Sequence, residues 1–227
     1  RHFDSLEPDY LENIRLMCLK AGLHICYIGV SNDFMKDGVK GEREVQSVKK
    51  WIDIAAQMGI GMVRVFGGRI PEGESFETMY PILLRNTKKA VSYGRKKGVV
   101  CGLHNHNHGS GPSTGQEVLR LLDDVRDRYY SHILDTGQYK GSPGASLGDR
   151  GIEETEWGFY DSIKLSAPKA VQIRAKLYRI ASGNELWLDY HRIMPILVNA
   201  KFNGWMSIVF EGQDEMNETD AVPLGVN

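Results

Sequence analysis

The stretch GVVCGLHNHNH, residues 98–108, holds the pattern that decides the fold: a glycine, a short apolar run, and a cluster of polar side chains. Gly98 ends a helical segment, and the apolar run after it has the length and the β-branched content of a strand. Polar residues begin at His104, directly where this strand ends. The same unit of helix, strand and polar residues repeats along the chain.

Six such units follow one another without a break in composition. Their helical segments carry apolar residues three and four positions apart, as expected of helices that bury one face. The apolar helical faces span Leu11–Ala21, Val45–Ala55, Phe76–Gly94, Val118–Val125, Trp157–Ala167 and Tyr190–Ala200. The apolar runs predict strands at His24–Val30, Met62–Phe66, Val99–Leu103, Ser131–Leu134, Ala170–Leu177 and Trp205–Phe210. Strands that alternate with helices indicate a parallel sheet, because each parallel connection needs a crossover.

The residues at the strand ends favour one parallel architecture over another. A doubly wound sheet usually has a glycine-rich phosphate loop after an early strand, and neither G-x-G-x-x-G nor a P-loop occurs. Polar or ionisable residues instead follow nearly every strand: Asn32, Asp33, Arg69, His104, His106, Asp135, Lys176 and Glu211. A (β/α)₈ TIM barrel builds its active site in this way. Because six strands cannot close such a barrel, we expect residues 1–227 to form a single TIM-barrel domain that lacks about two N-terminal strands.

Composition excludes several classes of function. The 227 residues are 41% hydrophobic, which is enough for one sizeable core. A net charge of −1 without a basic stripe argues against a nucleic-acid partner, and no apolar run approaches the ~20 residues of a membrane span. Three irregularly spaced cysteines are typical of reduced, buried thiols. We expect a cytoplasmic protein with a small-molecule partner; self-association stays open, as does a signal upstream of Arg1.

Imidazoles and carboxylates stand at three of the strand ends. His104, His106 and His108 alternate, so on an extended backbone their rings share a face. Asp135 and Glu211 each directly follow an apolar run, and burying an acid without a partner is costly. A polar loop and a turn-forming aspartate are the structural alternatives. Together these groups suit Mn²⁺, Fe²⁺, Co²⁺ or Zn²⁺ better than Ca²⁺.

The fifth predicted strand places cations on its inner face. Gln172, Arg174 and Lys176 alternate with apolar residues and would point into the barrel. Two cations inside a barrel need anionic partners. These partners are either the oxygens of a substrate or, in a structural ion-pair layer, Asp135 and Glu211.

The chain resembles the xylose isomerase-like TIM-barrel proteins, often called sugar phosphate isomerases/epimerases. The resemblance runs from Ser31 to Asp214 and rests on the order and spacing of several segments. These are Trp51–Ala55, Arg64–Gly68, His104–His106, Asp135–Gln138, Leu188–Tyr190, Phe202–Trp205 and Ile208–Gly212. It implies a sugar or keto-sugar substrate and proton transfer next to a carbonyl. It also implies a divalent metal, held by a Glu, an Asp, a His and a second Glu from four successive strands.

Carried over residue by residue, the resemblance predicts the site. Asp135 and Glu211 take the Asp and second Glu positions, His104 replaces the first Glu, and Arg174 replaces the His. We therefore expect Mn, Co, Fe, Zn or Mg on His104, Asp135 and Glu211, with Glu211 and His104 as the catalytic groups. Alternatively the guanidinium has replaced the metal, since arginine cannot ligate one. Five side chains are expected to contact the substrate: Asn32, Arg64, His106, Arg174 and Lys176.

Three functions follow from these observations. The first is a metal-assisted sugar or keto-sugar isomerase or epimerase. The second is a lyase that cleaves keto-glycosides, of the C-glycoside-cleaving type, because one carboxylate, one imidazole and an arginine suit elimination beside a carbonyl. The third is a non-catalytic sugar-binding barrel, which would explain the residues found at positions 104 and 174. Specificity depends on strand-end loops, including the long stretch 137–156, whose sequence does not identify a substrate.

Overall fold

The computed structural model describes residues 3–144, 151–181, 183–212 and 216–226. Within them six parallel strands form one sheet in the order β1-β2-β4-β6-β7-β10. The strands are β1 (Ile28–Gly29), β2 (Met62–Phe66), β4 (Val100–His104), β6 (Tyr130–Asp135), β7 (Ala170–Leu177) and β10 (Trp205–Phe210). Each strand pairs with the next one along the chain, so the sheet grows in a single direction. That order is typical of a TIM barrel and differs from a doubly wound sheet, whose order reverses.

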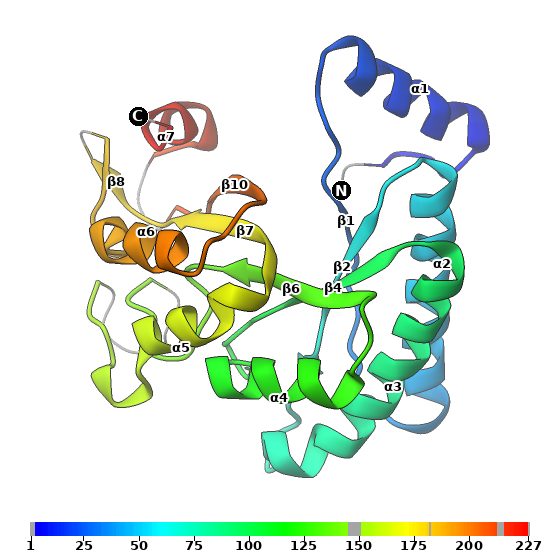
Figure 1. Ribbon diagram of the computed structural model, residues 1–227, viewed down its shortest axis with the longest axis horizontal. Coiled ribbons are helices and arrows are strands. Elements are labelled where there is room, and N and C mark those ends of the chain that lie inside the picture. Colours follow the sequence, from blue (N-terminus) through cyan, green and yellow to red (C-terminus); the bar gives the residue numbers. More distant parts are fainter. Residues whose placement is uncertain (1–2, 145–150, 182, 213–215, 227) are drawn as a thin grey trace.

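The helices surround this sheet as an arc (Figure 1). They are α1 (Pro8–Lys20), α2 (Gly38–Gln57), α3 (Phe76–Lys97), α4 (Gly115–Val125), α5 (Phe159–Ser166), α6 (Tyr190–Asn199) and α7 (Glu218–Leu224). From α2 to α6, each helix packs against the next in chain order. Among the described residues, no helix is long and apolar enough to cross a membrane. The arrangement of parallel strands inside and helices outside confirms the predicted TIM-barrel fold with six strands.

Capping residues fix where two of the helices begin. The Ser75 hydroxyl accepts a hydrogen bond from the Thr78 backbone N–H at 3.1 Å, and Thr114 does the same for Glu117 at 3.2 Å. In both cases the third helical residue bonds back to the cap, which completes a capping box. At its other end α3 stops at Gly98, whose φ of +73° suits glycine. The chain therefore enters β4 directly after a well-defined helix end.

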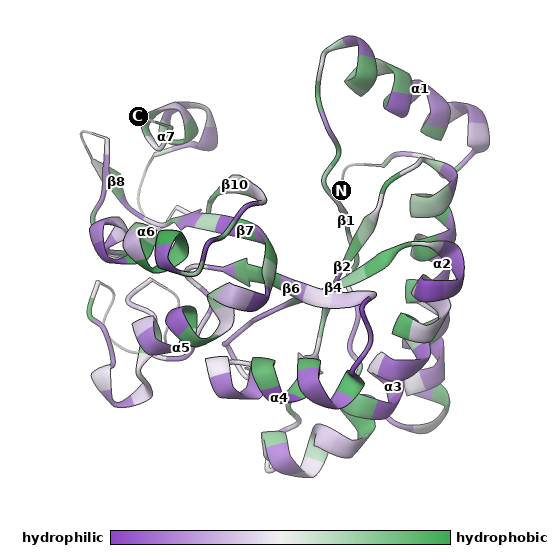
Figure 2. Ribbon diagram, in the orientation of Figure 1, coloured by the Kyte–Doolittle hydropathy of each residue, from purple (hydrophilic) through white to green (hydrophobic). Residues whose placement is uncertain are grey.

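The alternation of side chains along the strands separates the core from the site. Val63 and Val65 of β2 are buried in the hydrophobic core shared with the helices. Arg64 lies between them and so points to the opposite, inner face of the sheet. Figure 2 shows hydrophobic and hydrophilic residues mixed along the outer helices, as expected of helices with one buried face. The inner face is left for polar side chains at the ends of the strands.

Helix α7 and two short ribbons were not predicted, and two predicted elements begin clearly later than expected. The first strand was expected over His24–Val30 but contains only Ile28 and Gly29, because only these residues pair in register with β2 at this edge. The helix expected from Trp157 starts two residues later. Gly158, with a φ of +57°, separates a short 3₁₀ turn from α5.

Two short antiparallel ribbons complete the structure. β3 (Gly68–Arg69) pairs with β5 (Ser110–Gly111), and β8 (Ile180–Ala181) pairs with β9 (Asn184–Glu185). Gly68 has a φ of +146°, and a Cβ there would lie 2.2 Å from Asp33 Oδ1. Only glycine fits this position, because the ribbon lies so close to the segment that follows β1 at the carboxyl end of the sheet.

Candidate active site

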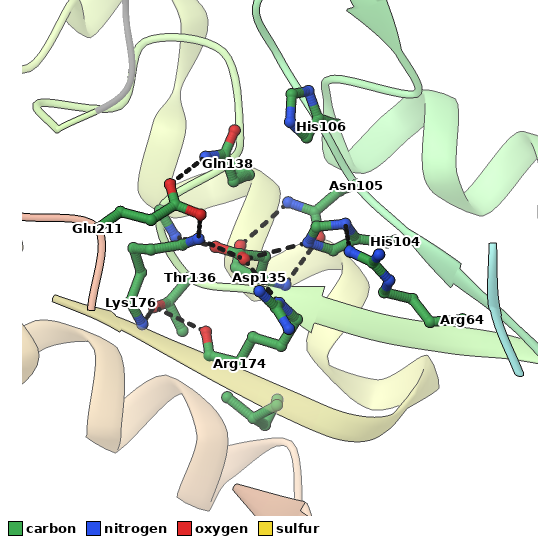
Figure 3. A network of polar contacts seen from close by, with 12 residues as sticks. Arg64, His104, Asn105, His106, Asp135, Thr136, Gln138, Arg174, Lys176 and Glu211 are labelled. Atoms are coloured by element: carbon green, nitrogen blue, oxygen red, sulfur yellow. Dashed lines mark hydrogen bonds and ion pairs between the residues drawn. The ribbon is translucent and has the colours of Figure 1, made fainter. Parts of the chain in front are cut away.

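The carboxylate of Asp135, at the end of β6, is the centre of the site and is fully buried. Its Oδ2 atom lies 3.1 Å from His104 Nε2, 3.1 Å from Arg174 Nε and 3.2 Å from Lys176 Nζ. Its Oδ1 atom accepts the backbone N–H of Gly137 at 3.0 Å. Figure 3 shows these side chains converging from neighbouring strand ends. The parallel register places Asp135 directly beside Arg174, which explains how the two groups meet.

The surroundings of Asp135 fix its charge and that of His104. Burial alone would raise the pKa of Asp135, but Lys176, His104 and Arg174 together hold it well below its usual range. Burial lowers the pKa of His104 to about 3 despite the nearby Asp135. His104 is therefore neutral, and its Nε2 must carry the hydrogen because a carboxylate only accepts. Its Nδ1 faces Arg64 Nη1 at 3.5 Å, so both ring nitrogens have partners.

The ammonium of Lys176 connects Asp135 to Glu211. Lys176 is buried, and its Nζ lies 2.5 Å from Glu211 Oε1. The other Glu211 oxygen accepts the side-chain amide N–H of Gln138 at 3.3 Å. The Glu211 side chain is still 47% exposed. Both oxygens of the Glu211 carboxylate are thus hydrogen-bonded, while part of the side chain still reaches solvent.

Two arginines add positive charge to the inner face. Arg174 Nη1 donates to the Tyr27 hydroxyl at 2.6 Å. Burial lowers the pKa of Arg174, but the Asp135 carboxylate and Tyr27 outweigh it and the net pKa is raised. Arg64 lies over the Phe66 ring at 4.3 Å, and burial, then Arg174, lower its pKa to about 10. With Lys176, three cationic side chains face two carboxylates, which favours an anionic or strongly polarised ligand.

The predicted metal ligands do not come together as one set. His104 and Asp135 are in contact, and the Lys176 ammonium lies between Asp135 and Glu211. In the part of the chain that the structure describes, no group of three or more His, Cys, Asp or Glu side chains is arranged to hold a metal. An ion between the carboxylates would need the space of Lys176 Nζ and would lie near the positive Arg174. The predicted metal site is therefore not confirmed, and Arg174 and Lys176 pair with the carboxylates in the ion-pair layer that was one of the two arrangements expected for these cations.

A cavity of about 250 Å³ is lined by Phe66 and His106, whose ring centroids lie 4.9 Å and 6.0 Å from that of His104. Its lining residues are Ser31, Asn32, Asp33, Phe66, Gly68, Arg69, His106 and Ser110. His106 donates from Nδ1 to the Asn107 carbonyl at 3.0 Å, which leaves Nε2 as the nitrogen that can accept a proton. Burial lowers the pKa of His106. Asn32 also lines the cavity, but its side-chain amide pairs with the backbone N–H and C=O of Phe66.

Sequence reasoning missed three residues that position the cluster. Gln138 bonds to Glu211, Tyr27 bonds to Arg174, and Asn105 pairs with the backbone of Asp135. Gln138 and Asn105 belong to strand-end segments that carry the family resemblance, and this was the available signal. The sequence around Tyr27 carried no such signal, because Tyr27 and Arg174 are 147 positions apart in the chain.

Comparisons with known proteins agree with this architecture. The profile of the family described as xylose isomerase-like TIM barrel matches residues 1–223. A crystal structure of a D-tagatose 3-epimerase-like protein is 14% identical, with a TM-score of 0.75 over 96% of this chain and 80% of the other. The 3-keto-D-glucoside 4-epimerase of E. coli is 13% identical, with a TM-score of 0.72 over 96% and 83%. The D-psicose 3-epimerase of Clostridium cellulolyticum H10 with D-tagatose is 10% identical, with a TM-score of 0.71 over 96% of this chain and 75% of the other.

These identities are low enough that the structural likeness establishes the fold alone. No curated protein matches the sequence. The family match, by contrast, covers almost the whole chain and agrees with the strand order and the strand-end site. The chain belongs to the xylose isomerase-like TIM barrel family.

Proposed function

We propose that the protein is a carbohydrate isomerase or epimerase that moves a proton next to a carbonyl. The observation that carries this proposal is the Glu211 carboxylate, which is half exposed and held by Lys176 and Gln138 beside a buried cationic cluster. A fixed carboxylate that reaches solvent can act as a general base. The names of the similar structures, which are ketose and keto-glucoside epimerases, support a carbohydrate substrate.

The neighbouring charges suit the transition state of this reaction. When Glu211 removes a proton next to a carbonyl, negative charge develops on the carbonyl oxygen. Lys176 and Arg174 would stabilise this charge. Cations that the fold already holds in position are effective because they need not reorganise during the reaction. We assign Arg64 the same supporting role from β2.

His106 is the proposed second proton carrier. In the view of Figure 3, Glu211 lies to the left of Asp135 and His106 lies above it to the right. His106 would take up a proton from solvent at Nε2 and deliver it to the opposite face of the carbon, which inverts the configuration, while Glu211 releases the proton it removed to solvent. His104 is less suited to this role, because both its ring nitrogens are engaged by Asp135 and Arg64. The catalytic assignment of the sequence therefore keeps Glu211 and moves from His104 to His106.

A lyase is the second candidate, because a single exposed carboxylate beside fixed cations also suits elimination next to a carbonyl. The similar structure of an epimerase for 3-keto-D-glucoside makes keto-glycosides a reasonable substrate class to test. The positive excess of the site would accept phosphorylated sugars as well as neutral ones.

Product analysis on a defined set of sugars tests the proposal. The set comprises D-tagatose, D-psicose, D-fructose, L-ribulose, 3-keto-D-glucosides and ketose phosphates. We expect mass-neutral conversion of at least one member and its loss in Glu211→Gln, with Glu12→Gln as a control at an exposed position of α1. Release of water or an aglycone would identify the lyase instead. Binding without conversion would favour the non-catalytic barrel.

A further inference from the structure

We propose that the site works with a built-in cation, the ammonium of Lys176, in place of a bound metal ion. The inference rests on the proposed function for its chemistry, and on the geometry of the carboxylates for its location. Lys176 would then bind the carbonyl oxygen of the substrate. Arg174 would keep a second positive charge beside it.

The position of Lys176 between the carboxylates is the first argument. Its Nζ lies 3.2 Å from Asp135 Oδ2 and 2.5 Å from Glu211 Oε1, and only 1% of the side chain is exposed. Lysine is rarely buried unless its charge is paired. An ammonium has three N–H groups, and two of them are used by the carboxylates. We assign the third to a substrate oxygen that approaches beside Glu211, whose side chain is 47% exposed.

The surrounding chain holds Lys176 in this position. Its backbone N–H donates to the Thr136 hydroxyl at 3.0 Å, and its carbonyl accepts from the Tyr190 hydroxyl at 2.7 Å. Gly137 leaves room for the side chain, since a Cβ there would lie 2.7 Å from Lys176 Cγ. The fold therefore fixes the backbone and the first part of the side chain, and the two carboxylates hold the ammonium.

Arg174 makes the same space unsuitable for a divalent ion. Its guanidinium lies 3.1 Å from the Asp135 oxygen that also faces Lys176 and His104. Arginine cannot lose its charge in a protein and cannot ligate a metal. The positive charges of Lys176 and Arg174 already balance the negative charges of Asp135 and Glu211, before Arg64 is counted. A metal would have to displace Lys176 and approach Arg174 without gaining a new anionic ligand.

Metal binding by the purified protein tests this inference without any substrate. The protein is treated with EDTA, dialysed and titrated with MnCl₂, and heat release, melting temperature and bound metal are measured. We expect substoichiometric metal and no change of melting temperature for the wild type. The variant Lys176→Met/Arg174→His vacates the space and supplies an imidazole. It should gain Mn²⁺ binding, with a rise of about 5–10 °C at a hundredfold excess over Kd.

Lys97→Met is the matched control, because Lys97 forms an exposed ion pair with Asp53 at 2.7 Å. It should respond to Mn²⁺ as the wild type does. Stoichiometric Mn²⁺ binding by the wild type would overturn the inference, and so would a folded double variant that binds no more metal than the wild type. If the double variant does not fold, the wild type and Lys176→Met alone decide. None of these results depends on turnover, so a failed search for isomerase activity is a separate outcome.

Discussion

Replacing Asp135 by asparagine tests the buried charge cluster most sharply. Asp135→Asn keeps the shape of the side chain but removes the buried negative charge that His104, Arg174 and Lys176 share. It also points an amide at groups that donate hydrogen bonds. Breaking a buried ion pair typically costs about 3–5 kcal/mol, because the remaining charge is left uncompensated. Since Glu211 still pairs with Lys176, we expect a loss near 3 kcal/mol.

Urea unfolding at pH 7, followed by tryptophan fluorescence, measures this loss. Asp53→Asn is the matched control, because Asp53 pairs with Lys97 at 2.7 Å but its side chain is 46% exposed. An exposed pair of this kind contributes about 0–1 kcal/mol. Adding Lys176→Met to Asp135→Asn removes one of the uncompensated charges. The double variant should therefore lose about 1–3 kcal/mol less than the sum of the two single variants.

Two results would refute this reasoning. One is an Asp135→Asn variant that is no less stable than Asp53→Asn. The other is exact additivity of Asp135→Asn and Lys176→Met, which would mean that the carboxylate and the ammonium do not interact in the folded protein. Either would remove the ion-pair layer on which the assignment of the site rests.

Three further predictions concern other parts of the fold. Burial lowers the pKa of His132 from 6.5 to about 4. The contribution of neutral His132 to the free energy of unfolding should therefore be fully present above pH 6.5, and it should fall by roughly 3 kcal/mol as the pH is lowered to 4. His132→Gln should flatten that dependence in urea unfolding at pH 7 and 4.5. Thr114→Ala removes the bond to the Glu117 N–H and should cost about 1 kcal/mol by thermal unfolding. Gly137→Ala should displace Lys176 and lower both melting temperature and turnover, with unchanged kinetics contradicting it.

The sequence predicted the bounds of three strands well, among them β10 at one edge of the sheet, but it predicted β1 at the other edge poorly. The bounds of β2, β7 and β10 agree with the predicted apolar runs, because these runs are flanked by turns and polar residues. The extent of β1 depends instead on how far β2 offers it a partner. Pairing is a property of the neighbouring strand, so the residues of β1 alone do not contain it.

The sequence predicted which charged residues lie together at the strand ends, but not the contacts between them. Asp135, Glu211, Arg174 and Lys176 were identified from their positions after or along the strands, and the structure brings them together. The sequence left open whether the cations face a substrate or the carboxylates. A lysine has several rotatable bonds, so its strand position does not fix where its nitrogen lies. The position of Lys176 Nζ between two carboxylates therefore required the structure.

Solvent deuterium exchange tests the central claim, proton transfer by Glu211, most directly. The sugar that the protein converts is incubated in D₂O, and deuterium at the carbon next to the carbonyl is followed by NMR. The account predicts incorporation with the wild type and a loss of rate of about 10²-fold or more with Glu211→Gln. Conversion without any deuterium incorporation, or exchange at the wild-type rate in Glu211→Gln, would contradict it.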